Sequence, residues 1–154
     1  MGYDAHRLVE GRPLILGGVT VPYHLGLLGH SDADVLSHAI GDAFLGAVGA
    51  GDMGRHFPDK DPAYKGISSL VLLAEIMQIV RQRGFQPVNV DATVVCEAPR
   101  LTPHVPEMLG RLAPVLGLLP EEINLKATTT EHLGFAGRGE GMAAYAVVLV
   151  KKAE

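Results

Sequence analysis

The chain has 154 residues, a length typical of one domain that folds without disulfides. Its net charge of −4 and the lack of any basic run argue against nucleic acid as the main partner. Cys96 is the only cysteine, so no internal disulfide can form and a reducing compartment is indicated. No apolar run approaches the roughly 18 residues that a membrane span needs, and no charged-then-apolar leader is visible. We therefore expect a cytoplasmic protein that does not enter membranes.

The first residues carry two possible ligands at a spacing of two. In an extended segment, Asp4 and His6 would point to the same side, so that a carboxylate and an imidazole face one point. A polar segment without a function would show the same short pattern. Further along, residues 13–16 and 19–22 flank a pair of glycines, which predicts a β-hairpin with a glycine turn.

Residues 30–42, with the sequence HSDADVLSHAIGD, predict a central helix. Ser31 followed by Asp34 has the form of a hydroxyl cap with an acid in the first turn, and apolar residues recur behind it at helical spacing. Asp34, His38 and Asp42 lie four residues apart, so either carboxylate could orient the His38 ring. Because helix N-termini attract anions, we expect this helix to combine a metal ligand with an anion site.

The middle of the chain predicts a long loop and two further helices. Residues 51–62 are rich in Gly, Pro and Asp, and a loop of this length is either functional or a solvated connector. One helix is predicted to begin at Ser68 and end at Gly84, and another to begin at Pro103 and end at Gly117.

Strands are predicted at residues 88–96, 123–128 and 142–150. The last of these is apolar on both faces, which is typical of a strand that is buried on both sides. Because strands and helices interleave without long gaps, we expect a single α+β domain over residues 1–154, with helices on one face of a mixed sheet. A subunit interface would cover the other face of the sheet.

Two groups of residues could carry chemistry. Asp4, His6 and His38 form a set of two histidines and one carboxylate, which leaves one tetrahedral position open as in catalytic zinc sites. The run KATTTE that ends at Glu131 offers hydroxyls and a carboxylate that could hold Mg²⁺ together with phosphate, and Arg138 could add a cation. Spacing alone does not separate these functions from β-favouring threonines and surface polar residues.

Several motifs resemble those of the 2-C-methyl-D-erythritol 2,4-cyclodiphosphate synthases, in the same order and over nearly the whole chain. They are Asp4-Ala5-His6, His30-Ser31-Asp32-Ala33-Asp34 with His38, Gly51-Asp52-Met53-Gly54, Phe57-Pro58-Asp59, Ala98-Pro99-Arg100, Lys126 to Glu131, Gly134-Phe135 and Gly137 to Gly141. Each motif is weak alone, but together they are highly specific. The resemblance implies a homotrimer with active sites between neighbouring subunits, so that the sheets of the subunits face each other.

The resemblance also implies an activity and its cofactors. This family converts 4-diphosphocytidyl-2-C-methyl-D-erythritol 2-phosphate into the 2,4-cyclodiphosphate and CMP, within the non-mevalonate route to isoprenoids. Asp4, His6 and His38 would bind Zn²⁺, whose open position would take the β-phosphate. Glu131 would hold Mg²⁺ or Mn²⁺ bridging the two phosphates of the diphosphate.

His30 and Thr129 would act in catalysis by stabilising the transition state. The residues that the resemblance places at the substrate are Asp4, His6, His30, Ser31, Asp52, Gly54, Phe57, Pro58, Asp59, Lys60, Asp61, Ala98, Arg100, Leu101, Thr128, Thr129, Glu131, Phe135 and Arg138. Those between Ser31 and Asp61 would contact or adjoin the methylerythritol phosphate. Residues 96–102 and Thr128 would receive the cytidine, and Phe135 and Arg138 would complete the phosphate end.

The chemistry of such a reaction agrees with the residues present. The attacking group is the 2-phosphate of the substrate, which is already ionised because its second pKa is about 6, so no protein nucleophile is required. The motifs by themselves fit two other functions as well. One is a zinc-dependent phosphohydrolase of a nucleoside diphosphate derivative, whose product would contain an added water, and the other is a metal-stabilised trimeric binding module without turnover.

Overall fold

A five-stranded mixed sheet forms the centre of the computed structural model, which describes all of residues 1–154. Its strands lie in the order Gly26–Leu27 (β4), Gly2–Val9 (β1), Gly141–Lys152 (β7), Phe85–Val95 (β5) and Ile123–Thr128 (β6). Neighbouring strands are antiparallel except β5 and β6, which are parallel. The fold is therefore α+β with a mixed sheet, as the interleaved pattern predicts.

A separate hairpin consists of Leu14–Leu16 (β2) and Val19–Val21 (β3). Its two-residue turn places Gly17 at a φ of 57° and Gly18 at 74°, which is the conformation that a tight hairpin requires and that glycine adopts without steric cost. The predicted hairpin with its glycine turn is thus confirmed.

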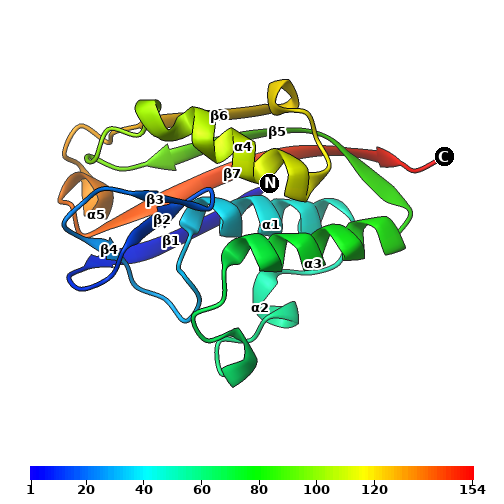
Figure 1. The fold of residues 1–154 in the computed structure, drawn as a ribbon, viewed down its shortest axis with the longest axis horizontal. Helices are drawn as coiled ribbons and strands as arrows, with labels where there is room; N and C mark the ends of the chain where they lie inside the picture. Colours follow the sequence, from blue (N-terminus) through cyan, green and yellow to red (C-terminus); the bar gives the residue numbers. More distant parts are fainter.

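Three longer helices cover one face of the sheet (Figure 1): Val35–Ala47 (α1), Ser69–Gln82 (α3) and Val105–Leu116 (α4). Helix α1 lies across β1 and β7, α4 packs against β6, and α3 packs against α1 and α4. The predicted start of α3 at Ser68 and end of α4 at Gly117 are confirmed, because the Ser68 side chain caps α3 and Gly117 ends α4 in a left-handed conformation. Helix α4 itself begins at Val105, after a 3₁₀ turn at Thr102–His104, and not at the predicted Pro103. None of the helices combines the length and the apolar character needed to cross a membrane.

Short helical segments interrupt two regions that the sequence predicts as loops. Residues 51–62 contain Met53–His56 (α2) and the beginning of a 3₁₀ turn at Pro62–Tyr64, and the glycine-rich segment after β6 contains Gly134–Gly137 (α5). Two more 3₁₀ turns, at Thr102–His104 and Pro120–Glu122, precede α4 and β6. Such short turns give an otherwise irregular loop a defined backbone path.

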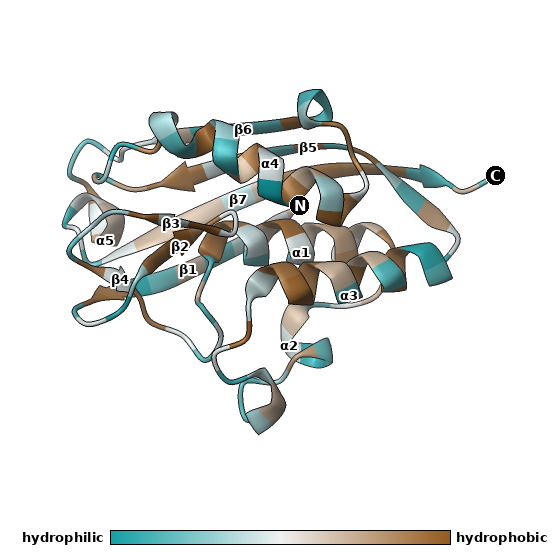
Figure 2. Cartoon of the chain, in the orientation of Figure 1, coloured by the Kyte–Doolittle hydropathy of each residue, from teal (hydrophilic) through white to brown (hydrophobic).

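The main core lies between the helices and the sheet. Leu36, Ile40 and Phe44 on α1 are fully buried, and they face the buried side of β7, where Ala144 and Ala146 leave room for the helix. Figure 2 shows hydrophobic residues recurring along β7 and along the hairpin of β2 and β3. At β1 the close approach of α1 depends on Gly2, because a side chain there would collide with the backbone of Ala39 and Ala43.

The other face of β7 is not covered within this chain. Tyr145, Val147 and Leu149 alternate with the buried residues of β7, and 46%, 55% and 56% of their surfaces are exposed. The single chain covers only one face of this strand, because all three longer helices lie on one side of the sheet, and the predicted cover of the other face by a subunit interface stays a prediction. An exposed apolar surface of this kind is typical of an interface.

The start of α1 differs from the prediction. Asp34, rather than Ser31, caps the helix, because its carboxylate accepts the N–H of Ser37 at 3.0 Å. The same carboxylate accepts the N–H groups of Gly17 and Gly18 at 3.0 and 2.8 Å. The predicted anion site at this helix end is therefore wrong, since a buried protein carboxylate already occupies it.

Candidate active site

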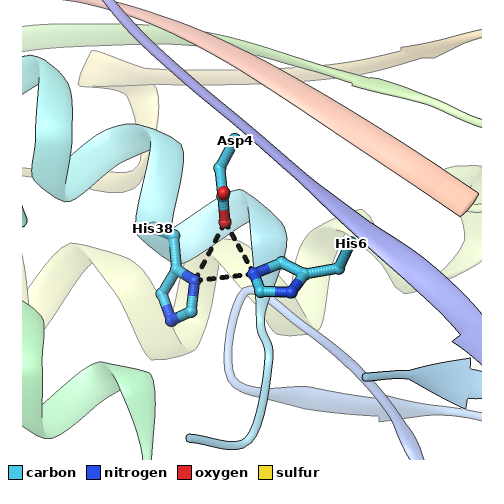
Figure 3. Close-up of side chains that lie close together, drawn as sticks. All are labelled: Asp4, His6 and His38. Atoms are coloured by element: carbon cyan, nitrogen blue, oxygen red, sulfur yellow. Dashed lines mark hydrogen bonds and ion pairs between the residues drawn. The ribbon is translucent and has the colours of Figure 1, made fainter. Parts of the chain in front are cut away.

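Asp4 and His6 lie on β1, and His38 lies in the first turn of α1, which crosses that strand (Figure 3). Because residues two apart on a strand share a face, both β1 side chains point toward the helix. Asp4 Oδ2 lies 2.8 Å from His6 Nε2 and 3.0 Å from His38 Nδ1, and the two nitrogens are 3.2 Å apart. The predicted grouping of these three residues is confirmed, and together they could hold a metal ion.

The charges in this cluster depend on one another. Burial opposes ionisation of Asp4, but hydrogen bonds from His38 and His6 hold the pKa of its carboxyl well below the usual range. Burial also opposes protonation of His6, whereas the hydrogen bond to Asp4 and the charge of Asp4 raise the pKa of this imidazole. The cluster therefore attracts positive charge, either as protons or as a metal ion.

Each histidine is also held at the nitrogen that faces away from the cluster. His6 Nδ1 donates to the carbonyl of Leu28 at 2.7 Å. His38 Nε2 lies 2.8 Å from Ser69 Oγ and 3.2 Å from Ser31 Oγ. No sequence pattern indicated Ser69, because no spacing rule relates a serine in one helix to a histidine 31 residues earlier in another.

Neither acid that was predicted to orient His38 does so. The Asp34 carboxylate is directed at the N–H groups of the hairpin turn and of Ser37. The Asp42 carboxylate accepts the N–H of Met53 at 3.2 Å, at the start of α2. The prediction is therefore wrong, because Asp34 lies before the first turn of α1 and Asp42 is directed at a different loop.

A cavity of about 250 Å³ opens beside the metal-ligand cluster. Besides Asp4, His6 and His38, it is lined by these residues that the resemblance places at the substrate: His30, Ser31, Asp52, Gly54, Phe57 and Asp59. Pro58, Lys60 and Asp61 belong to the same loop but do not line the cavity; the carbonyl of Asp61 accepts a hydrogen bond of 2.9 Å from His30 Nε2. Tyr3, Asp42, Met53, Tyr64 and Leu72 complete the lining, although no motif assigned them to the substrate.

The remaining predicted residues lie outside this cavity: Ala98, Arg100, Leu101, Thr128, Thr129, Glu131, Phe135 and Arg138. Leu101 lines a second cavity of about 400 Å³ beside α4, and Thr128 and Phe135 line a third of about 340 Å³ next to Tyr145. The side chains of Thr129 and Glu131 are exposed. One chain therefore does not bring the Glu131 carboxylate into the cavity of the metal-ligand cluster.

The turn that carries Glu131 has an unusual backbone. Glu131 and His132 have φ values of 52° and 65°, a left-handed conformation that side chains other than glycine rarely adopt. Glu97 Oε1 accepts the N–H of Thr130 at 2.9 Å and that of His132 at 3.3 Å. The bond from Thr130 contributes most to holding the pKa of Glu97 below its usual range. The resemblance placed Glu97 only within residues 96–102, at the cytidine, and nothing in the sequence indicated its contact with this turn, which it precedes by more than 30 residues.

Arg138, which was expected at the phosphate end, forms a surface ion pair. Its Nε lies 2.7 Å from Glu140 Oε1, and more than half of each side chain is exposed. A substrate phosphate would have to share or replace this partner.

The chain resembles known proteins over almost its full length. The YgbB family matches residues 1–151. A relative from Pelotomaculum thermopropionicum named 2-C-methyl-D-erythritol 2,4-cyclodiphosphate synthase is 61% identical over 151 residues, which are 98% of this chain and 93% of the relative.

Two solved structures show the same fold. The bifunctional IspDF from Campylobacter jejuni has a TM-score of 0.95 at 44% identity, and the match covers 99% of this chain and 42% of that one. A CDP-bound 2C-methyl-D-erythritol-2,4-cyclodiphosphate synthase has a TM-score of 0.89 at 39% identity, covering 97% of both chains. The chain therefore belongs to the YgbB family, together with these cyclodiphosphate synthases.

Proposed function

We propose that this enzyme converts 4-diphosphocytidyl-2-C-methyl-D-erythritol 2-phosphate into 2-C-methyl-D-erythritol 2,4-cyclodiphosphate and CMP, in the cytoplasm, as a step of non-mevalonate isoprenoid synthesis. The synthase activity itself, that of a phosphorus–oxygen lyase, follows from family membership and from 61% identity to a named synthase. The structural observation that carries the mechanism is the convergence of Asp4, His6 and His38 beside a polar cavity.

The reaction requires charge neutralisation and positioning more than acid–base chemistry. An oxygen of the substrate 2-phosphate forms a bond to the β-phosphorus, the bond from that phosphorus to the oxygen of CMP breaks, and no water is consumed. The attacking phosphate is ionised because its second pKa is about 6. Holding the substrate folded can contribute on the order of 7–11 kcal/mol in favourable cases.

We assign Zn²⁺ to Asp4, His6 and His38. Two imidazole nitrogens and one carboxylate oxygen are a common donor set of catalytic zinc, and their mutual distances fit ligands that converge on one ion. A zinc ion there would supply Lewis acidity to a phosphate oxygen of the substrate.

Residues around the cluster would bind and orient the substrate. His30 Nε2 donates to the Asp61 carbonyl, and in the imidazolium form Nδ1 would also donate, to a substrate phosphate, as a role in stabilising the transition state requires. Ser31, Asp52 and Gly54 line the same cavity and would contact the methylerythritol phosphate. The loop from Phe57 to Asp61 would lie beside it.

The second half of the site is proposed to come from a neighbouring subunit of a homotrimer. The support is that Thr129 and Glu131 lie outside the cavity of their own chain and that the open face of β7 exposes large apolar side chains. Glu131 would hold Mg²⁺ or Mn²⁺ at the diphosphate, with Thr129 beside it and Phe135 and Arg138 nearby. Residues 96–102, including Ala98, Arg100 and Leu101, would take the cytidine together with Thr128, and a relative of known structure is described as CDP-bound.

The test is a mass-spectrometric assay of the purified protein with this substrate, Zn²⁺ and Mg²⁺ in ¹⁸O-labelled water. We expect CMP and an unlabelled cyclic diphosphate in equal amounts. His38→Ala should abolish both products, whereas His24→Ala, which changes an exposed histidine outside the cavity, should leave them unchanged. A hydrated, labelled product would instead establish the phosphohydrolase, which no observation favours, and bound metal without CMP would establish a binding module.

The homotrimer is tested by sedimentation of the wild type and of Val147→Asp. Because Val147 is exposed in the single chain, the added charge should not disturb the monomer fold but should prevent burial of this face. We expect a trimer for the wild type and a folded, inactive monomer for the variant. A wild-type monomer with full activity would overturn this part of the proposal.

A further inference from the structure

The two histidines of the metal-ligand cluster are held by acceptors of different kinds. His6 Nδ1 faces the carbonyl of Leu28, and a carbonyl oxygen can only accept a hydrogen bond. A proton is therefore held on His6 Nδ1, and Nε2 faces Asp4, as a donor while it is protonated and as a ligand when a metal ion takes the place of that proton. His38 Nε2 instead faces the hydroxyl of Ser69, which can either donate or accept. The backbone alone does not decide which nitrogen of His38 carries the proton.

Asp32 settles the direction of this hydrogen bond. Asp32 Oδ1 accepts the Ser69 hydroxyl, and Asp32 Oδ2 accepts the Ser69 N–H at 3.0 Å. Both Asp32 oxygens are engaged as acceptors, since Oδ1 also accepts the N–H of Asp34, so the hydroxyl proton of Ser69 points to Asp32. The lone pairs of Ser69 Oγ then face His38, whose Nε2 must be the donor.

We propose that Asp32 and Ser69 are positioning residues that fix the His38 ring with a proton on Nε2, so that Nδ1 faces Asp4 and His6 and offers its lone pair when a metal ion takes the place of the proton there. This inference rests on the proposed function, because a lone pair at Nδ1 matters only if the cluster binds a metal ion. Carboxylates that act through a hydrogen bond on a ligating histidine raise its basicity and restrict its orientation. Here a serine hydroxyl transmits the effect of the carboxylate.

Burial and backbone hydrogen bonds hold Asp32 and Ser69 in place. Ser69 is the first residue of α3 and is 1% exposed. The loop that carries Asp32 is tied to the segment before α3 by two backbone hydrogen bonds, from Asp32 to Ile67 at 3.0 Å and from Gly66 to His30 at 2.8 Å. The packing of α3 against α1 thus sets the distance between Ser69 and His38.

Ser31 provides a weaker second contact to the same ring nitrogen. Its Oγ lies 3.2 Å from His38 Nε2, compared with 2.8 Å for Ser69, and it also accepts the N–H of Ala33. Removing the Ser69 hydroxyl should therefore weaken the orientation of His38 without abolishing it. We expect an effect near the lower end of the 10- to 100-fold range that is usual for such outer partners.

The experiment measures zinc affinity without substrate, by competition with a chromophoric chelator, for the wild type, Ser69→Ala, Asp32→Asn and Ser68→Ala. Ser68→Ala is the matched control, because it removes the neighbouring hydroxyl, which caps α3 through Leu70, and does not touch His38. In parallel, long-range ¹H–¹⁵N spectra of metal-free, histidine-labelled protein report whether His38 Nε2 carries a proton, since bound zinc would by itself keep the proton off Nδ1. Circular dichroism verifies that each variant is folded.

We expect Ser69→Ala to bind zinc about tenfold more weakly and to lose the uniform Nε2–H signal of His38. Asp32→Asn should lower the zinc affinity and the Nε2–H signal in the same direction, since an amide can also donate a hydrogen bond to Ser69. Ser68→Ala should change neither. Wild-type zinc affinity and an unchanged Nε2–H signal in Ser69→Ala would overturn this inference but leave the proposed metal site standing. If the wild type and His38→Ala bound zinc equally, the metal site would fail, and the inference with it.

Discussion

The metal-ligand cluster and the Glu131 turn differ in how completely one chain builds them. Asp4, His6 and His38 lie on a central strand and a long helix, and two of the three have a further hydrogen-bond partner behind them. Glu131 lies on an irregular exposed turn with a left-handed backbone. Side chains on regular elements are held more precisely than those on loops. The cluster is therefore complete within one chain, whereas the function proposed for the Glu131 turn requires a partner subunit.

The difference follows from where the core lies. All three longer helices pack on the side of the sheet that carries the cluster, so this half of the site is enclosed. The other face of the sheet is open at Tyr145 and Val147. A second subunit on that face would bring the Glu131 turn of one chain toward the cluster of another.

The largest expected loss of activity follows from substitution of a residue in the metal-ligand cluster. His38→Ala removes one of three ligands, and we expect at least about a thousandfold loss of kcat/KM, because a metal Lewis acid is worth several kcal/mol. Bound zinc, measured by elemental analysis, should fall with the activity. His24→Ala should match the wild type in both measurements. Full activity of His38→Ala after metal removal would contradict the assignment.

The next largest effect tests whether the Glu131 turn and the metal-ligand cluster act independently. Glu131→Gln keeps the size of the side chain but removes its charge, so we expect about a hundredfold lower kcat, as for the loss of one charge-stabilising group. Zinc content and oligomeric state should stay at wild-type values, because Glu131 lies outside the cavity of its own cluster. A loss of zinc in this variant would show that the two regions are not independent.

Glu97→Ala should have a smaller effect on the same turn. It removes the acceptor for the N–H groups of Thr130 and His132, which releases a backbone held at positive φ. Such a conformation costs of order 1–3 kcal/mol. We therefore expect the variant to need about tenfold more Mg²⁺ for half-maximal activity. Glu97→Gln retains an acceptor oxygen and should lie close to the wild type. If the wild type, Glu97→Ala and Glu97→Gln needed the same Mg²⁺ concentration, Glu97 would not be required to hold the Glu131 turn.

The smallest effect is a pH dependence of stability. The N–H of Thr130, the first of several causes, lowers the pKa of Glu97 in the folded state, so its contribution to stability is present above the unfolded pKa of about 4.3. The contribution is lost as the pH falls through the lowered folded pKa. The difference in unfolding free energy between the wild type and Glu97→Gln should therefore be largest near neutral pH and vanish in acid. Denaturant titrations at several pH values measure it, and a difference that grew on acidification would contradict the stated sign.

Local signals predicted a large part of the fold. The hairpin around Gly17, the cap at Ser68, the end of α4 at Gly117 and the strand Ile123–Thr128 were all found at their predicted places. These features depend on a few adjacent residues, such as a glycine with positive φ or a serine that caps a helix. The start of α1 was misjudged because Ser31 and Asp34 are both good capping residues, and the hairpin turn selects Asp34.

The site was less predictable, because its contacts join distant parts of the chain. The ligand set of Asp4, His6 and His38 was found through its donor types and its resemblance to a family, but the partners behind it were not. Ser69 reaches His38 across 31 residues, and Glu97 reaches His132 across 35. Periodicity within a segment contains no information about such pairs.

The sequence by itself determined where the longer helices and most of the strands lie, which face of each is apolar, and that an acid and a histidine two residues apart would share one side of a strand. Only the tertiary structure decided that β1 lies between β4 and β7 beneath α1, where Asp4 and His6 meet His38. It also decided that Ser69, rather than Asp34 or Asp42, faces the His38 ring. The physical reason is that local conformation follows from neighbouring residues, whereas the order of strands and the crossing of helices follow from burial of the whole core.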